Sequence, residues 1–172
     1  MEFTKIVVLG VFAVVLYGVL HDQVTVRICL EYFTIGHPQL IRSTSPTLLA
    51  LAWGVVATWW VGLPLGVILA MAARRGNRPK LTAAQVRPFV LRLLIVVGLL
   101  ASMSGLVAYV LATHGDVTLP RDWSDLLPPT AQVPFLVDAW THLASYVFGI
   151  VGGAVIAMLI YRRRGLLTPG AA

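Results

Sequence analysis

Four long apolar stretches, separated by more polar segments, organise this chain. They cover residues 6–20, 46–73, 92–113 and 139–161. A helix needs about 20 mainly apolar residues to cross the hydrocarbon core of a bilayer, and it satisfies its backbone polar groups within its own segment. The pattern therefore predicts an all-α integral membrane protein, folded as a single four-helix transmembrane bundle over residues 1–172.

The first stretch is shorter than the others. It holds fifteen uncharged residues between Lys5 and His21. At about 1.5 Å per residue it covers roughly 22 Å, which is less than the hydrocarbon core of about 30 Å. His21 and Asp22 are therefore expected near the membrane boundary and not in bulk water.

The second stretch carries three marked features. Ser45 followed by Pro46 is typical of a helix start, because the hydroxyl can cap the helix and proline fits its first turn. Pro64 is expected to kink the helix, and neighbouring helices can satisfy the carbonyl that it frees. Trp59 and Trp60 lie near mid-span, away from the usual aromatic belt. Core packing is favoured for them, with contact to an apolar cofactor or pigment, or to a partner protein, left open.

The distribution of charge predicts the orientation in the membrane. The chain is 58% hydrophobic and 12% charged, with a formal net charge of +6. Basic residues gather in the loop over residues 74–92 and in the tail at 162–164, so both segments and both termini are expected on the cytoplasmic side of a bacterial inner membrane. The aromatic residues are not interleaved with the basic ones as a base-stacking surface requires, which argues against nucleic-acid binding.

Two outer segments, residues 21–45 and 114–138, connect the spans on the opposite side. All four histidines and six of the seven acids lie in or beside them. Apolar and polar residues alternate over 24–32, a period typical of a strand. An extended segment is slightly favoured there, and a helix that pairs Arg27 with Glu31 stays open. Prolines and apolar residues in the second segment predict a cap folded onto the bundle.

Ionisable side chains are expected to gather where the first span ends and the fourth begins. Isolated charges at the hydrocarbon edge are costly, and pairing lowers that cost. The expected members of this polar outer cluster are His21, Asp22, Arg27, Glu31, Asp138 and His142.

Three chemical interpretations of this cluster stay open. Histidine nitrogens and carboxylate oxygens are ligands for zinc, iron or manganese, so His21, His142 and Asp138 form a candidate metal site. Two histidines at one depth also suit the axial pair of a haem. The plain alternative is a hydrogen-bonded network in which Asp138 caps the fourth helix.

Small residues recur four apart along two of the spans. Such spacing places them on one helix face, where two backbones can approach closely. We expect these faces to make the closest contact in the bundle, between spans 2 and 4, and an interface with another protein is the alternative. The residues are Gly54, Thr58, Gly62 and Gly66 in the second span, and Ser145, Gly149 and Gly153 in the fourth.

One stretch of the chain carries a resemblance. Residues 17–37 read YGVLHDQVTVRICLEYFTIGH. Together with residues 59–63 and 138–146, this stretch resembles a family of uncharacterised bacterial four-span membrane proteins with an HDQ…EYFTIGH signature. The likeness covers most of the chain. It implies no established activity, so no functional residues are carried over.

No sharp catalytic motif stands out, and function is predicted by elimination. Cys29 is the only cysteine, which excludes an intramolecular disulfide and a Cys-x-x-Cys metal site. The centres of the spans lack the ionisable residues usual in transporters. The favoured function is a non-catalytic accessory or scaffold subunit of a larger envelope complex, partnered by other membrane proteins. The alternatives are a metal- or haem-binding membrane protein or redox enzyme with an outer site, and a small transporter or oligomeric channel.

Overall fold

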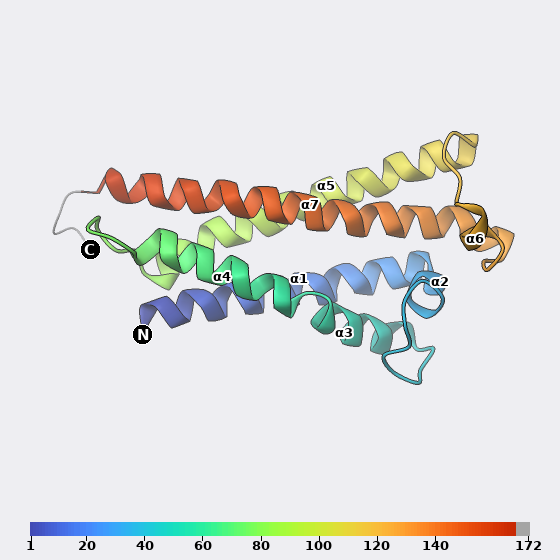
Figure 1. Cartoon of the computed structure of the whole chain (residues 1–172), viewed down its shortest axis with the longest axis horizontal. Helices are drawn as coiled ribbons and strands as arrows, with labels where there is room; N and C mark the ends of the chain where they lie inside the picture. Colours follow the sequence, from blue (N-terminus) through green and yellow to red (C-terminus); the bar gives the residue numbers. More distant parts are fainter. Residues whose placement is uncertain (168–172) are drawn as a thin grey trace.

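The structure is a computed structural model that describes residues 1–167. Long helices run side by side along the length of the molecule, and the start of α1 and the end of α7 lie at the same end of it (Figure 1). The described residues contain no β-strand. The helices are α1 (Glu2–Ile28), α2 (Leu30–Thr34), α3 (Pro46–Val56), α4 (Trp59–Arg74), α5 (Ala83–His114), α6 (Arg121–Ser124) and α7 (Pro129–Gly165).

The predicted fold class is confirmed. Four helical segments are long and apolar enough to cross a membrane, with α3 and α4 together forming the second of them. Each is longer than the apolar stretch that predicts it, because a helix does not end where the hydrocarbon core ends. The start of α5 shows this well: Thr82 and Gln85 form a capping box about ten residues before the apolar stretch at 92–113 begins.

The prediction of an extended segment after the first span is wrong. α1 continues without interruption to Ile28, Cys29 adopts an extended conformation, and α2 follows at once. Val26 is buried in the bundle, whereas Val24 and Ile28 are exposed. At a membrane boundary, apolar side chains are stable on the lipid-facing side of a helix as well as on its buried side. An apolar alternation is therefore a poor guide to strands here.

The predicted close contact between spans 2 and 4 is also wrong, because the glycines of the second span face the first span. A Cβ atom on Gly54 would lie 2.5 Å from the Cα atom of Val19, and one on Gly66 would lie 2.6 Å from the carbonyl oxygen of Val7. Gly10 of α1 approaches Gly66 equally closely. The first span has small residues of its own, so α1 is the helix that fits against α3 and α4. α5 and α7 form the other closely packed pair of helices.

Gly149 shows the contrast most clearly. A Cβ atom built there would meet no other atom of the described residues within 4 Å. Gly153, one turn further along α7, comes close only to the side chain of Leu65. Of these two glycines, only Gly153 packs on the second span, and it receives a side-chain end and not a helix backbone, whereas open space lies beside Gly149.

The second span is interrupted at Ala57 and Thr58, and not at Pro64. Ala57 and Thr58 form turns between α3 and α4, whereas Pro64 lies inside α4. Val61 donates its N–H to the carbonyl of Thr58, three residues back. The Thr58 hydroxyl donates to the carbonyl of Gly54, and the Tyr146 hydroxyl of α7 donates to the carbonyl of Ala57 over 3.3 Å. A neighbouring helix thus satisfies a carbonyl at the break, as a membrane interior requires.

The prediction that the two central tryptophans pack in the core is wrong as well. Trp59 and Trp60 are 50% and 55% exposed. They are the first two residues of α4, directly after the break.

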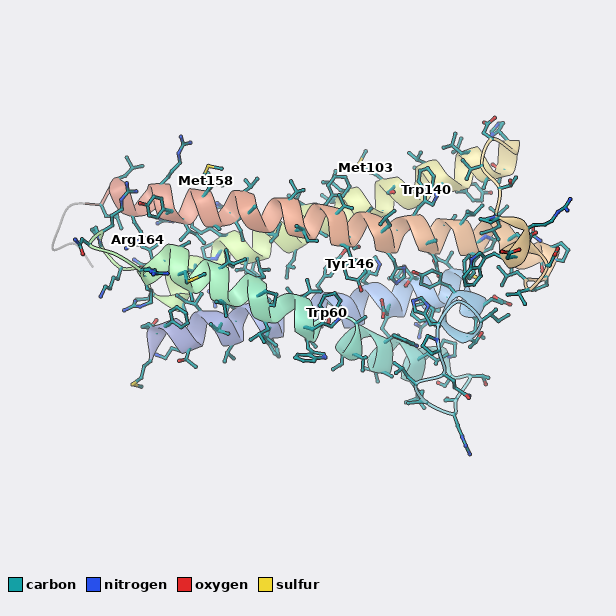
Figure 2. All side chains as sticks on the ribbon, in the orientation of Figure 1. Trp60, Met103, Trp140, Tyr146, Met158 and Arg164 are labelled. Carbon is teal, nitrogen blue, oxygen red and sulfur yellow. The ribbon has the colours of Figure 1, made fainter. Side chains whose placement is uncertain are left out.

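A buried arginine stabilises the end of the bundle where α1 begins and α7 ends. The guanidinium of Arg164 is fully buried and donates to four backbone carbonyls. It lies against the loop that follows α4 (Figure 2). The acceptors are Ala72 and Pro79, each at 2.7 Å, and Arg75 and Arg78, each at 3.0 Å. Because several of these carbonyls end α4 and lack helical partners, one cation both caps that helix and ties it to α7.

Candidate functional site

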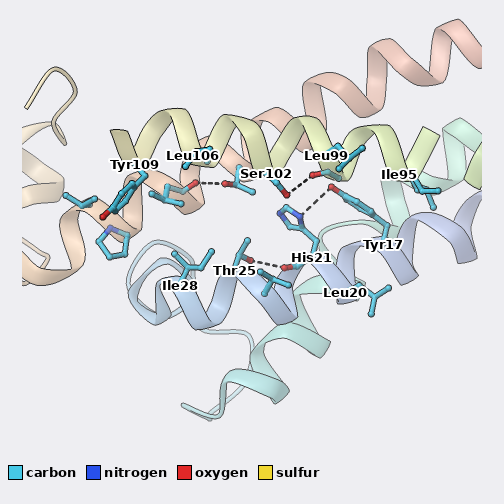
Figure 3. A pocket seen from close by; sticks show the side chains of 18 residues that line it. Tyr17, Leu20, His21, Thr25, Ile28, Ile95, Leu99, Ser102, Leu106 and Tyr109 are labelled. Atoms are coloured by element: carbon cyan, nitrogen blue, oxygen red, sulfur yellow. Dashed lines mark hydrogen bonds between the residues drawn. The ribbon is translucent and has the colours of Figure 1, made fainter. Parts of the chain in front are cut away.

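Toward the other end of the molecule the helices leave two hollows. The first, which we name the central cavity, has a volume of about 470 Å³ and lies between α1, α4, α5 and α7. The second, the lateral groove, has a volume of about 700 Å³ and lies between α1, α5 and α7. Tyr17, His21 and Leu94 line both hollows and so form the wall between them. Figure 3 shows Tyr17 and His21 in the lining of the lateral groove.

The wall is held by hydroxyl contacts across the bundle. The Tyr17 hydroxyl lies 2.9 Å from Oγ of Ser145 on α7 and 3.5 Å from Nδ1 of His21 on its own helix. Nε2 of His21 is buried and has no hydrogen-bond partner within the described part of the chain. A buried polar nitrogen without a partner is costly, so this atom is a place where a ligand would gain a bond.

His142 faces His21 from α7, and the role of its Nδ1 atom follows from its contact. Nδ1 of His142 lies 2.8 Å from the backbone carbonyl oxygen of Asp138. A carbonyl oxygen only accepts, so Nδ1 carries the hydrogen and donates it. In the neutral ring, Nε2 then has a free lone pair. That atom points at Oδ1 of Asp22 over 3.3 Å.

The three side chains together meet the basic requirement of a metal site. One ligand atom from each of His21, Asp22 and His142 lies within 4.8 Å of the others. The two imidazole rings are in edge contact, with centroids 4.7 Å apart. Asp22 is 5% exposed. Two histidines and one carboxylate from two helices form the donor set that zinc, iron or manganese takes, with coordination positions left open.

The same ring contact argues against the haem interpretation. An axial histidine pair holds the porphyrin plane between its two imidazoles. The rings of His21 and His142 touch each other directly, which leaves no space for a macrocycle between them.

The structure does not bring all six predicted cluster members together. Asp138 is fully buried, and its carboxylate oxygens have no partner among the described residues. It meets His142 through its backbone carbonyl only. Arg27 donates to Oε1 of Gln23 and Oγ1 of Thr47, and so turns away from Glu31.

Glu31 and Asp138 lie instead near the lone cysteine. Sγ of Cys29 is 3.6 Å from Oε2 of Glu31. Burial raises the pKa of the Cys29 thiol to about 12, and the negative charges of Asp138 and Glu31 add to the shift. The thiol is therefore protonated at neutral pH and is not a metal ligand.

Several residues of the site are missed by the sequence analysis. The ring of Tyr32 stacks on His142 with centroids 4.6 Å apart, and Trp53 lies against His37. Burial raises the pKa of the Tyr32 phenol, and the carboxylate of Asp138 adds to this effect. One signal was present in the sequence: Tyr17 precedes His21, and Tyr146 follows His142, by one helical turn each.

Comparison with known proteins found no matching protein family, no similar curated protein and no similar solved structure. The family resemblance described above therefore stays a prediction.

Proposed function

We propose that this integral membrane protein binds a divalent first-row transition metal through His21, Asp22 and His142. One observation carries the proposal. Nε2 of His142 and Oδ1 of Asp22 face each other over 3.3 Å, and with Nδ1 of His142 as the donor to Asp138 both are acceptors in the neutral ring. Two acceptors at that distance need a proton or a cation between them, and the nearby unpartnered nitrogen of His21 supplies a third ligand for a cation.

The surroundings suit a metal in two further ways. The bond from Nδ1 of His142 to the Asp138 carbonyl fixes the ring orientation, as the outer hydrogen bonds of metal-binding histidines do. Metal–ligand bonds of about 2.0–2.2 Å need the ligand atoms roughly 3.5 Å apart, which small side-chain rotations provide. The open coordination positions would face the central cavity, since all three residues line it. These features favour metal binding over the purely non-catalytic subunit that composition alone suggested.

We further propose that the site lies in the outer half of a bacterial inner membrane. The N-terminus, the α4–α5 loop and the end of α7 lie at one end of the molecule (Figure 1), and these segments carry Arg74, Arg75, Arg78 and the arginines at 162–164. The positive-inside rule assigns that end to the cytoplasm. A membrane-impermeant thiol reagent should then label a cysteine placed at position 118 in whole cells, and should not label one placed at position 78.

Metal analysis of purified protein tests the proposed function. Protein prepared without chelators should contain about one equivalent of zinc, iron or manganese, or should take up zinc on titration. His142→Ala and Asp22→Asn should each lower zinc affinity by at least about 100-fold, since even an outer-shell change costs 10- to 100-fold. Asn is nearly the same size as Asp, so the second variant removes charge without opening a cavity.

The matched control is His114→Ala. His114 is exposed, lies outside the cluster and makes the same kind of bond from Nδ1 to a backbone carbonyl. It should leave zinc affinity unchanged. Wild-type protein that stays metal-free on titration contradicts the proposal, as does an equal loss of affinity in the His114 variant.

A further inference from the structure

The central cavity has a feature that metal binding does not explain, which is its long apolar wall. Beyond the polar residues, it extends along the bundle between Val14, Val61, Leu65, Leu93, Val97 and Ile150. Trp60 on α4 and Ile150 on α7 line it and are 55% and 67% exposed. Because these two exposed residues line it, the cavity opens sideways between α4 and α7, toward the region where lipid chains lie.

No side chain fills the cavity beside Gly149. A side chain at this position would project into open space, because a Cβ atom there has no neighbour within 4 Å among residues 1–167. Close-packed interiors rarely leave such space beside an inward-facing backbone.

The polar end of the cavity presents a donor that lacks an acceptor. Nε1 of Trp53 is buried and has no hydrogen-bond partner in the described chain, and Trp53 lines the cavity. An indole N–H only donates. It calls for an acceptor oxygen on whatever occupies the cavity, and this need remains when His21 holds a metal.

The charges of the lining exclude an acidic head group. Asp22 is the one carboxylate among the described lining residues, and no lysine or arginine is found among them. In the metal-free protein, a carboxylate or phosphate placed beside Trp53 would have no lysine or arginine within the cavity to pair with, and burying such a charge is costly. An uncharged carbonyl group satisfies the indole N–H at no such cost.

We propose that the central cavity binds a neutral, lipid-soluble molecule with a carbonyl oxygen, which enters from the bilayer between α4 and α7. The carbonyl would accept from Nε1 of Trp53, and the apolar part would lie along the wall past Gly149. Isoprenoid quinones and acyl esters of glycerol share this chemistry. This proposal rests on the central cavity and not on the metal ligands, so an experiment can contradict ligand binding without contradicting metal binding, and the reverse.

Native mass spectrometry of the detergent-purified full chain tests the proposal. Decylubiquinone represents the quinones, 1,2-dioctanoylglycerol the esters, and decanoate serves as a charged probe of similar length. Wild-type protein should bind one molecule of the quinone, the ester or both, and should bind decanoate more weakly. The compound that binds identifies the source of the carbonyl, and metal content is measured on the same samples.

Two variants on the same helix provide the sharpest comparison. Gly149→Phe should fill the cavity and lower affinity by at least about tenfold, while retaining its metal. Val151→Phe adds a ring on the lipid-facing side of α7, where Val151 is exposed, and should leave affinity within about twofold.

A third variant keeps the proposal testable should Gly149→Phe fail to fold. Trp53→Phe keeps an aromatic ring and removes the donor, so affinity should fall by about five- to tenfold, the effect of one lost hydrogen bond. Binding of neither carbonyl compound overturns the proposal. So does equal binding by the wild type and the two cavity variants, or tighter binding of decanoate than of both neutral probes.

Discussion

The hydroxyl groups of Tyr17 and Ser145 lie 2.9 Å apart and join the first long helix to the last across the bundle. They separate the central cavity from the lateral groove, since Tyr17 lines both hollows. The bond therefore closes a wall that no continuous packing of α1 against α7 provides.

Removing this bond should destabilise the protein measurably. Tyr17→Phe and Ser145→Ala should each lower the free energy of unfolding by about 1 kcal/mol, because each leaves a half-buried hydroxyl without its partner. The double variant should cost less than the sum of the two single changes. Thermal unfolding in detergent measures all four proteins. Additive losses would show that the two hydroxyls do not interact.

Replacing Gly66 or Gly149 with a larger residue should have opposite effects on folding. Gly66→Leu should prevent correct folding, because its Cβ atom would already lie 2.6 Å from the carbonyl oxygen of Val7 in α1. Gly149→Leu should fold, because open space lies beside it. The fraction of monodisperse protein after size-exclusion chromatography is the measurement. Equal recovery of the two variants would contradict the helix pairing described above.

Cys29 should be unreactive in the folded protein. The thiolate is the reactive form, and burial raises the thiol pKa to about 12, so N-ethylmaleimide at pH 7.5 should label it only after denaturation. The raised pKa also has a consequence for stability. The unfolded chain ionises near pH 8.5, so folding loses stability as the pH rises from about 9 toward 12. Cys29→Ser, whose hydroxyl does not titrate in this range, should weaken that loss.

The three arginines at the end of α7 should differ strongly from one another. Arg164→Ala leaves four backbone carbonyls without their donor, and a loss of about 3 kcal/mol or more is expected for a buried network of this kind. Arg162→Ala, at an exposed position, should change stability by less than about 0.5 kcal/mol. Thermal unfolding and the rate of proteolysis in the loop at 75–82 report the difference.

The length of apolar stretches was enough to predict the four spans, because a bilayer fixes the length of helix that must be apolar. The pairing of the spans was not predictable in the same way. Glycines four apart mark a helix face that packs closely, but they do not say which neighbour it meets. Gly54 and Gly66 meet α1, whose Gly10 and Gly18 follow a wider spacing of eight.

The level of the site along the bundle was predictable from the sequence, but the contacts of its side chains were not. The short first span indicated that His21 and Asp22 lie at the level where the fourth span begins, and the structure has them beside His142. The backbone contact of Asp138 depends on side-chain orientation at the helix surface, which sequence spacing does not define. Trp53 contributes from α3, whose direction depends on a break that no proline at that position signals.

The break at Ala57 and Thr58 divides the second span into two helices, α3 and α4. Arg164 bonds the end of α4 to α7 through backbone carbonyls. α3 carries Trp53 and packs against α2. The break therefore gives the second span two separate attachments, so that the helix which carries the indole of Trp53 takes a direction of its own, independent of the helix that is anchored at Arg164.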